Sequence, residues 1–113
     1  MSNDTTYLLD MLDAARLAVE YAEGKTLQAF KNDTLCQDAI VRRLTIIGEA
    51  ARRVSKETRN LLSGIPWVRI VGMRNLMVHV YDEVDLDLVW GTVQNDLPVL
   101  IAELARHVGT EEA

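Results

Sequence analysis

Apolar residues recur every three or four positions along most of the chain, which is the spacing of an amphipathic α-helix. One such stripe predicts a helix over Asp4–Glu23, and Gly24 suits its end. After a connection over Lys25–Asp33, Thr34 and Gln37 have the spacing of a capping box and predict the start of a second helix. The core-facing stripe of this helix consists of Ile40, Leu44, Ile47, Ala51 and Val54. No segment shows the alternation of a β-strand, so the sequence predicts an all-α fold.

Caps and prolines predict the elements that follow. Ser55 can cap a short helix over Lys56–Leu62. Pro66 suits the start of a further helix over Trp67–Tyr81, because its missing N–H group has no partner at that position anyway.

The last predicted helix has Asp85 as its cap and reaches about Val108. Pro98 lies inside it and should kink the helix or divide it in two. Gly48 interrupts the second helix at a cost in helix propensity, so we expect a close approach of another helix there. Together these elements predict one domain over residues 1–113, folded as an up-and-down four-helix bundle with an additional short helix.

Composition narrows the class of protein. The 113 residues are 49% hydrophobic and 26% charged, which is typical of a globular domain. A net charge of −5 argues against a protein that coats nucleic acid or a membrane through a wholly basic surface. One cysteine and two histidines allow no intrachain disulfide and argue against a metal site, and nothing in the sequence calls for a cofactor.

Two further observations concern location. The longest run without a charged residue has nine members, Asn60 to Val68, which is too short to cross a bilayer. The first residues show no signal-peptide pattern. We therefore expect a cytoplasmic protein.

The segment Gly72–Tyr81 concentrates candidate chemistry, because Arg74, Asn75, His79 and Tyr81 stand in an otherwise apolar helix. At about 100° per residue, Arg74 and His79 would lie about 140° apart around an α-helix. One helix therefore cannot present all four groups to a small ligand on one face. A groove, or an interface between two copies of the chain, could use them all.

These residue types suit phosphodiester chemistry. An imidazole such as His79 titrates near neutral pH and can move a proton to or from a ribose 2′-hydroxyl. The guanidinium of Arg74 matches two phosphate oxygens and stabilises developing charge. Asn75 can orient either partner, and the phenol of Tyr81 can accept a modification. Taken singly, each of these residues is more often a structural group on a bundle helix.

The motif does not stand alone, because several flanking segments accompany the complete Arg-Asn-x₃-His-x-Tyr arrangement. The matching segments are Ile47–Ala51, Ile65–Trp67, Gly72–Asn75, His79–Tyr81, Asp85, Val89–Trp90 and Asp96–Pro98. With these segments, most of the chain resembles the HEPN superfamily, specifically the HepT-like toxins of bacterial and archaeal toxin–antitoxin pairs.

The resemblance implies a homodimeric helical bundle that places two copies of the motif across a shared cleft and cleaves RNA without a metal ion. Arg74 and His79 match the family's catalytic pair, and Asn75 matches its polar residue after the arginine. The family's partner is a minimal nucleotidyltransferase antitoxin, which attaches AMP to the motif tyrosine, here Tyr81. A bulky, anionic adduct near Arg74 and His79 would repel an RNA phosphate.

A basic stripe offers a candidate surface for the RNA backbone. Arg42 and Arg53 lie 11 residues apart, nearly in line on the predicted second helix. The alternative is a solvated helix face paired with Glu49 and Glu57. A basic cleft of this kind can exist inside an acidic protein, so the net charge argues only against unspecific coating of RNA.

Two other functions stay open from the residues alone. The bundle could be a non-catalytic, nucleotide-binding or scaffolding subunit that complexes with a nucleotidyltransferase. It could also be mainly a substrate, with Tyr81 modified to regulate assembly. The intact pair of Arg74 and His79 favours the enzyme, because a scaffold has no chemical need for it.

Overall fold

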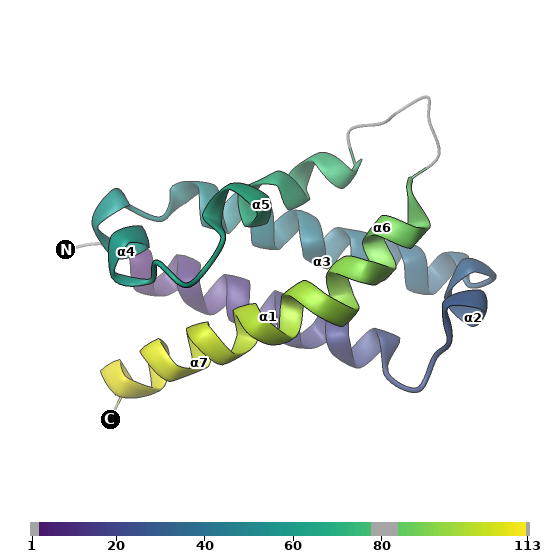
Figure 1. Cartoon of the computed structure of the whole chain (residues 1–113), viewed down its shortest axis with the longest axis horizontal. Coiled ribbons are helices and arrows are strands. Elements are labelled where there is room, and N and C mark those ends of the chain that lie inside the picture. The colour runs from purple at the N-terminus through teal and green to yellow at the C-terminus, as the bar shows by residue number, and fades with distance from the viewer. Residues whose placement is uncertain (1–2, 78–83, 113) are drawn as a thin grey trace.

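The centre of the fold is a pair of long helices that run side by side in opposite directions (Figure 1). The computed structural model describes residues 3–77 and 84–112 of the chain. The two helices are α1 (Asp4–Ala22) and α3 (Thr34–Arg53). Throughout the described ranges the regular structure is helical and no strand occurs, which confirms the predicted all-α fold.

The hydrophobic core lies between these helices and the C-terminal helix. Every residue of the stripe predicted for α3 is buried, from Ile40 through to Val54. They meet Leu8, Met11 and Leu12 of α1 and Leu97, Leu100 and Leu104 of the C-terminal segment in one cluster. Burying one such Leu, Ile or Met side chain stabilises a fold by about 1.5–3 kcal/mol. The apolar spacing of the sequence therefore identified the core correctly.

The segment before α3 was predicted to be a connection without regular structure. It contains the short helix α2 (Leu27–Lys31). The Thr26 side chain accepts a hydrogen bond from the backbone N–H of Ala29 and so caps this helix. Phe30 is fully buried and its ring lies 5.3 Å, centroid to centroid, from the ring of Trp90. One helical turn is too short to show a helical period, which is why the pattern missed it.

The predicted capping box of α3 is wrong. Asp33 is the N-cap, and its carboxylate accepts a 3.0 Å hydrogen bond from the Cys36 backbone N–H. Gln37 instead donates from its side chain to the carbonyls of Phe30 and Lys31. The hydrogen bond from Cys36, helped by one from Lys25, lowers the pKa of Asp33 below its ordinary value.

The short helix α4 (Lys56–Leu61) begins as predicted, with the Ser55 hydroxyl accepting from the Thr58 backbone N–H. A contact that the sequence did not indicate holds it against α1. The buried carboxylate of Asp4 accepts hydrogen bonds from the Ser55 backbone N–H and from the hydroxyls of Ser55 and Thr58. This contact ties the first turn of α1 to the cap of α4.

The helix predicted over Trp67–Tyr81 is helical as far as the structure describes it, but not as one α-helix. The α-helix α5 ends at Gly72 (Trp67–Gly72), and a 3₁₀-helix, η1 (Met73–Met77), continues the chain. Gly72 has low helix propensity, and a 3₁₀ turn at the end of an α-helix is common. The rest of the predicted helix lies outside the described residues.

The C-terminal segment is continuous but divided, in agreement with the effect expected of Pro98. Asp85 caps α6 (Leu86–Gly91), which leads through a π-helix, η2 (Thr92–Asp96), into α7 (Leu97–Glu112). Pro98 has no N–H group to offer the carbonyl four residues earlier, and a π turn there accommodates the missing bond.

The helices alternate in direction along the chain, as an up-and-down arrangement requires (Figure 1). In the view of Figure 1, α1 and α5 run towards the right, and α3 and the α6–α7 segment run towards the left. α5 and η1 pack on α3, whereas α7 packs on α1. No helix in the described ranges is long and apolar enough to span a membrane.

Candidate active site

Of the four motif residues, the structure places Arg74 and Asn75, both on η1. Asn75 is exposed, and the Arg74 side chain is half-buried with 37% of its surface accessible. His79 and Tyr81 lie outside the described residues. Because a 3₁₀-helix turns by about 120° per residue, the angles estimated for an α-helix do not hold for Arg74 and Asn75.

Gly48 positions η1 on α3. A Cβ atom at Gly48 would lie 2.5 Å from the Arg74 backbone nitrogen and 3.0 Å from the Val71 carbonyl oxygen. Both atoms belong to the backbone and cannot rotate away, so only glycine allows this approach. The predicted reason for Gly48 is confirmed, and the neighbour that it admits is the backbone of Arg74 itself.

Glu49, the residue after this glycine, lies between two arginines. Its carboxylate is 4.0 Å from Nη1 of Arg74 and 3.5 Å from Nη2 of Arg52. The pairing of Glu49 with Arg52 agrees with the alternative interpretation of the basic residues as a paired helix face, whereas its pairing with Arg74 links α3 to η1. Exposed pairs at such distances contribute only about 0–1 kcal/mol, so the guanidinium of Arg74 can exchange this carboxylate for a phosphate.

The basic residues between Arg42 and Arg59 differ in the contacts that they make. Arg59 donates to the carbonyls of Ala51, Arg52 and Val54 and so caps the end of α3. Arg52 pairs with Glu49. Arg42 and Arg53, the two candidates for RNA binding, are exposed and have no partner among the described residues.

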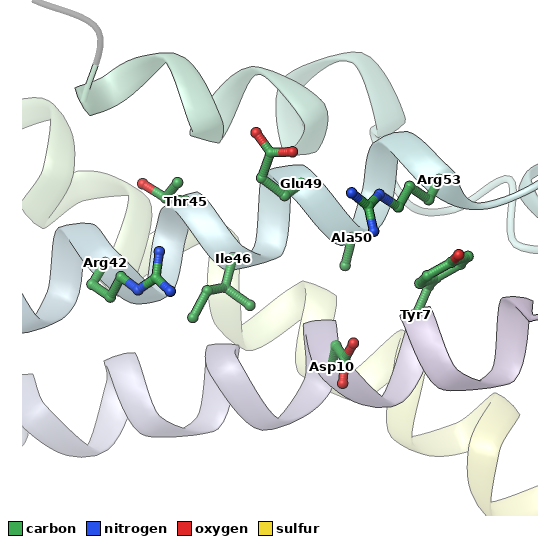
Figure 2. A pocket seen from close by; sticks show the side chains of 8 residues that line it. All are labelled: Tyr7, Asp10, Arg42, Thr45, Ile46, Glu49, Ala50 and Arg53. Carbon is green, nitrogen blue, oxygen red and sulfur yellow. The ribbon is translucent and has the colours of Figure 1, made fainter.

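Arg42 and Arg53 line a surface pocket of about 260 Å³ between α1 and α3 (Figure 2). Their guanidinium groups turn towards each other from the two ends of the pocket. Tyr7 and Asp10 of α1 form the opposite wall, and Glu49 points the other way, to the side where Arg74 lies. The lining is completed by Thr45, Ile46 and Ala50.

The site thus combines a half-exposed guanidinium on η1 with an arginine-lined pocket beside it, linked through Glu49. Such a surface can hold a phosphodiester at Arg74 and the adjoining strand along α3. The relation to known proteins fits this chemistry, because a family model described as "Ribonuclease HepT-like" matches residues 11–107. The chain belongs to the HepT-like ribonuclease family.

Several relatives of this HepT-like chain carry ribonuclease names. A "Putative RNase" of Methanocaldococcus jannaschii is 33% identical over 87% of this chain and 90% of its own length. A "Putative RNase" of Caldanaerobacter subterraneus is 34% identical over 88% of this chain and 89% of its own length. The "Probable ribonuclease HepT" of Thermococcus cleftensis is 35% identical over 83% of this chain and 86% of its own length. No solved structure matches the chain significantly.

Two further side chains of the HepT-like chain, those of Cys36 and Trp67, make hydrogen bonds within the fold. Burial raises the pKa of the Cys36 thiol, which donates to the Tyr21 carbonyl 3.6 Å away. Trp67 donates from its indole N–H to the Leu62 carbonyl. Among the described residues no three His, Cys, Asp or Glu side chains converge as metal ligands would.

Sequence reasoning missed the contribution of α1 to the pocket. Tyr7 and Asp10 lie three residues apart, one turn along α1, on the side that meets α3. A polar pair beside an apolar stripe is an ordinary feature of a bundle helix, so only the packing of α1 on α3 reveals that these residues face Arg42 and Arg53.

Proposed function

We propose that this HepT-like chain is a metal-independent endoribonuclease, the toxin of a toxin–antitoxin pair. The observation that carries the proposal is the family match over residues 11–107, a range that contains the whole Arg-Asn-x₃-His-x-Tyr motif. The half-exposed Arg74 on η1 supports it, because a guanidinium held this loosely is available to an incoming phosphate.

In the proposed reaction the ribose 2′-hydroxyl attacks the adjacent phosphorus atom, and the bond to the 5′-oxygen of the next nucleotide breaks. His79 takes the proton from the 2′-hydroxyl. Arg74 stabilises the negative charge that develops on the non-bridging oxygens, and Asn75 orients the phosphate. The products are one strand with a 2′,3′-cyclic phosphate and one with a free 5′-hydroxyl.

The leaving 5′-oxygen also needs a proton, and the motif supplies one histidine per chain. The other histidine, His107, lies on α7 and lines a different pocket with Glu103 and Arg106. A homodimer that faces two motifs across a cleft would supply a second imidazole as the general acid. For this reason we place the active site at a dimer cleft.

The partner in this proposal is a minimal nucleotidyltransferase antitoxin that attaches AMP to Tyr81. The adduct would bring a negative charge and a bulky nucleoside close to Arg74, which would then pair with it instead of with RNA. Arg42 and Arg53 are the proposed contacts to the RNA backbone.

Purified protein is expected to cleave single-stranded RNA in the presence of excess EDTA, because the proposed groups act without a metal ion. The product ends, read by phosphatase and kinase treatment, should be a 2′,3′-cyclic phosphate and a 5′-hydroxyl. A DNA strand of the same sequence has no 2′-hydroxyl and should stay intact. Cleavage that needs a divalent ion, or that cuts the DNA strand, would refute this chemistry.

Coexpression with a minimal nucleotidyltransferase encoded beside this chain is expected to increase the intact mass of the chain by at least one adenylyl group. The Tyr81→Phe variant should show no increase, because its ring has no hydroxyl. The matched control is Tyr21→Phe, which removes the hydroxyl of a half-buried tyrosine on α1. An adduct that persists in Tyr81→Phe would place the modification elsewhere.

A further inference from the structure

The pocket between α1 and α3 has the composition of a site for an anionic, aromatic ligand. Two arginines stand at its ends, and a tyrosine and a carboxylate form one wall (Figure 2). Its volume of about 260 Å³ is slightly below that of drug-sized ligand sites, which range over roughly 300–1,000 Å³. That size suits one nucleotide rather than a folded polymer.

Of the four arginines of α3, Arg42 and Arg53 are exposed and line the pocket, whereas Arg43 is half-buried and lies outside the pocket lining. Arg52 is engaged by Glu49, and Arg59 of α4 donates to the carbonyls at the end of α3. No described residue pairs with Arg42 or Arg53, although both guanidinium groups turn inward over the pocket (Figure 2). An unpaired guanidinium fork is suited to phosphate oxygens.

Tyr7 and Asp10 can provide the stacking surface and the hydrogen-bond acceptor that a nucleotide base needs. The half-buried ring of Tyr7 packs against the core on one side and lines the pocket with the rest of its surface. Unpaired RNA bases stack on such rings and are read along their hydrogen-bonding edges. The exposed carboxylate of Asp10 can only accept hydrogen bonds when ionised, so it favours a base that carries an amino group.

We propose that this pocket binds one unpaired nucleotide of the RNA substrate beside the cleavage site. Its base stacks on Tyr7, the phosphates on either side contact Arg42 and Arg53, and Asp10 selects adenine, cytosine or guanine over uracil. The inference rests on the proposed function for the identity of the ligand as RNA.

Glu49 connects this pocket to Arg74. It lines the pocket, yet its carboxylate points to the side of η1 and lies 4.0 Å from the Arg74 guanidinium. A strand whose nucleotide occupies the pocket would therefore continue past Glu49 to the phosphate held by Arg74. The pocket would then set which base stands next to the scissile bond.

The test measures binding of fluorescein-labelled 2′-O-methyl homopolymers of A, C and U, which cannot be cleaved because the 2′-oxygen is blocked. Wild-type protein should bind the A and C strands about fivefold more tightly than the U strand. Asp10→Asn should remove this preference. Tyr7→Ala should weaken binding of every strand about tenfold, whereas Tyr7→Phe should keep stacking and bind as wild type.

The double variant Arg42→Gln/Arg53→Gln should bind at least about tenfold more weakly, and its log–log salt slope should fall by about 1.4. Both residues are exposed, so this variant should fold even if Tyr7→Ala does not. The matched control is Arg16→Gln/Arg106→Gln, which removes the same charge from exposed positions outside the pocket and should bind as wild type.

Cleavage assays with the same proteins separate this inference from the proposed function. If wild type cleaves RNA but the Tyr7, Asp10 and double-arginine variants bind and cleave as it does, the pocket is not a subsite. If wild type cleaves nothing yet binds with the predicted dependence on these residues, the subsite stands and the ribonuclease proposal fails. If wild type neither binds any of the strands nor cleaves RNA, both are overturned.

Discussion

Gly48→Ala is expected to destabilise the protein by about 2 kcal/mol, although alanine is the better helix former. The added Cβ would stand 2.5 Å from the Arg74 backbone nitrogen, so η1 must move away from α3. Overpacking of this kind costs about 1–3 kcal/mol and occasionally more. The clash is with backbone atoms, so we expect a cost at the upper end of this range, about 3 kcal/mol. The gain in helix propensity, about 1 kcal/mol, then leaves a net loss of about 2 kcal/mol. Urea unfolding followed by circular dichroism would measure the difference.

The same substitution should reduce RNA cleavage in the folded protein about a hundredfold, because the clash falls on the backbone that carries Arg74. A displacement of about 1 Å can have an effect of this size on catalysis. The matched control is Gly109→Ala on α7, where a Cβ would meet nothing within 4 Å. This control should be as stable as wild type or more so, and should cleave normally. Unchanged stability and activity in Gly48→Ala would show that η1 is not fixed by this contact.

Gly48 also shows how far the sequence could predict the fold. A glycine inside a helix lowers helix propensity and is not explained by its neighbours in sequence, so the close approach of another helix was expected at this position. The stripe itself identified the buried face of α3, since burial follows the helical period. The identity of the approaching backbone was not readable, because it depends on the direction in which α5 leaves α4.

The sequence did not predict two features: a helix too short to show a helical repeat of apolar residues, and a change of helix type that coincides with a tertiary contact. α2 is one turn long and is held by the burial of Phe30, which meets Trp90 from the other end of the chain. The change from α-helix to 3₁₀-helix at Met73 occurs where the backbone presses on Gly48. The low helix propensity of Gly72 favours the end of α5, but propensities describe neither the burial of Phe30 nor the contact with Gly48, because both involve residues distant in sequence.

Some residues of the candidate site could be identified from the sequence, and others only from the packing of the helices. Arg74 and Asn75 could be chosen from the sequence because their residue types suit phosphodiester chemistry and the flanking segments resemble a family. Arg42 and Arg53 could also be chosen from the sequence, by their spacing along one helix, and the structure adds that Arg52 and Arg59 are engaged elsewhere. Tyr7 and Asp10 enter the site only because α1 packs along α3.

Arg74→Ala is expected to lower kcat/KM for RNA cleavage by about 10²–10³-fold, which is the usual effect of losing a group that stabilises transition-state charge. Stability should change little, because Arg74 is partly exposed and its ion pair with Glu49 is long. Arg74→Lys should recover only part of the activity, since an ammonium keeps the charge but lacks the planar fork. Initial rates on a labelled single-stranded RNA would measure the two activities, and urea unfolding would measure the stability.

His79→Ala should lower kcat/KM by about 10²–10⁴-fold, as expected for a general acid–base group. The double variant Arg74→Ala/His79→Ala should be scarcely worse than the more damaging single one, because residues that act on one transition state are not additive. The matched control is Arg69→Ala, which removes an exposed arginine of α5 whose partner is Asp96 and should leave cleavage unchanged. A His79→Ala or Arg74→Ala protein that cleaves RNA at the wild-type rate would refute the catalytic assignment. A proportional loss in Arg69→Ala would instead indicate that the whole α5–η1 segment, rather than its motif, is needed for cleavage.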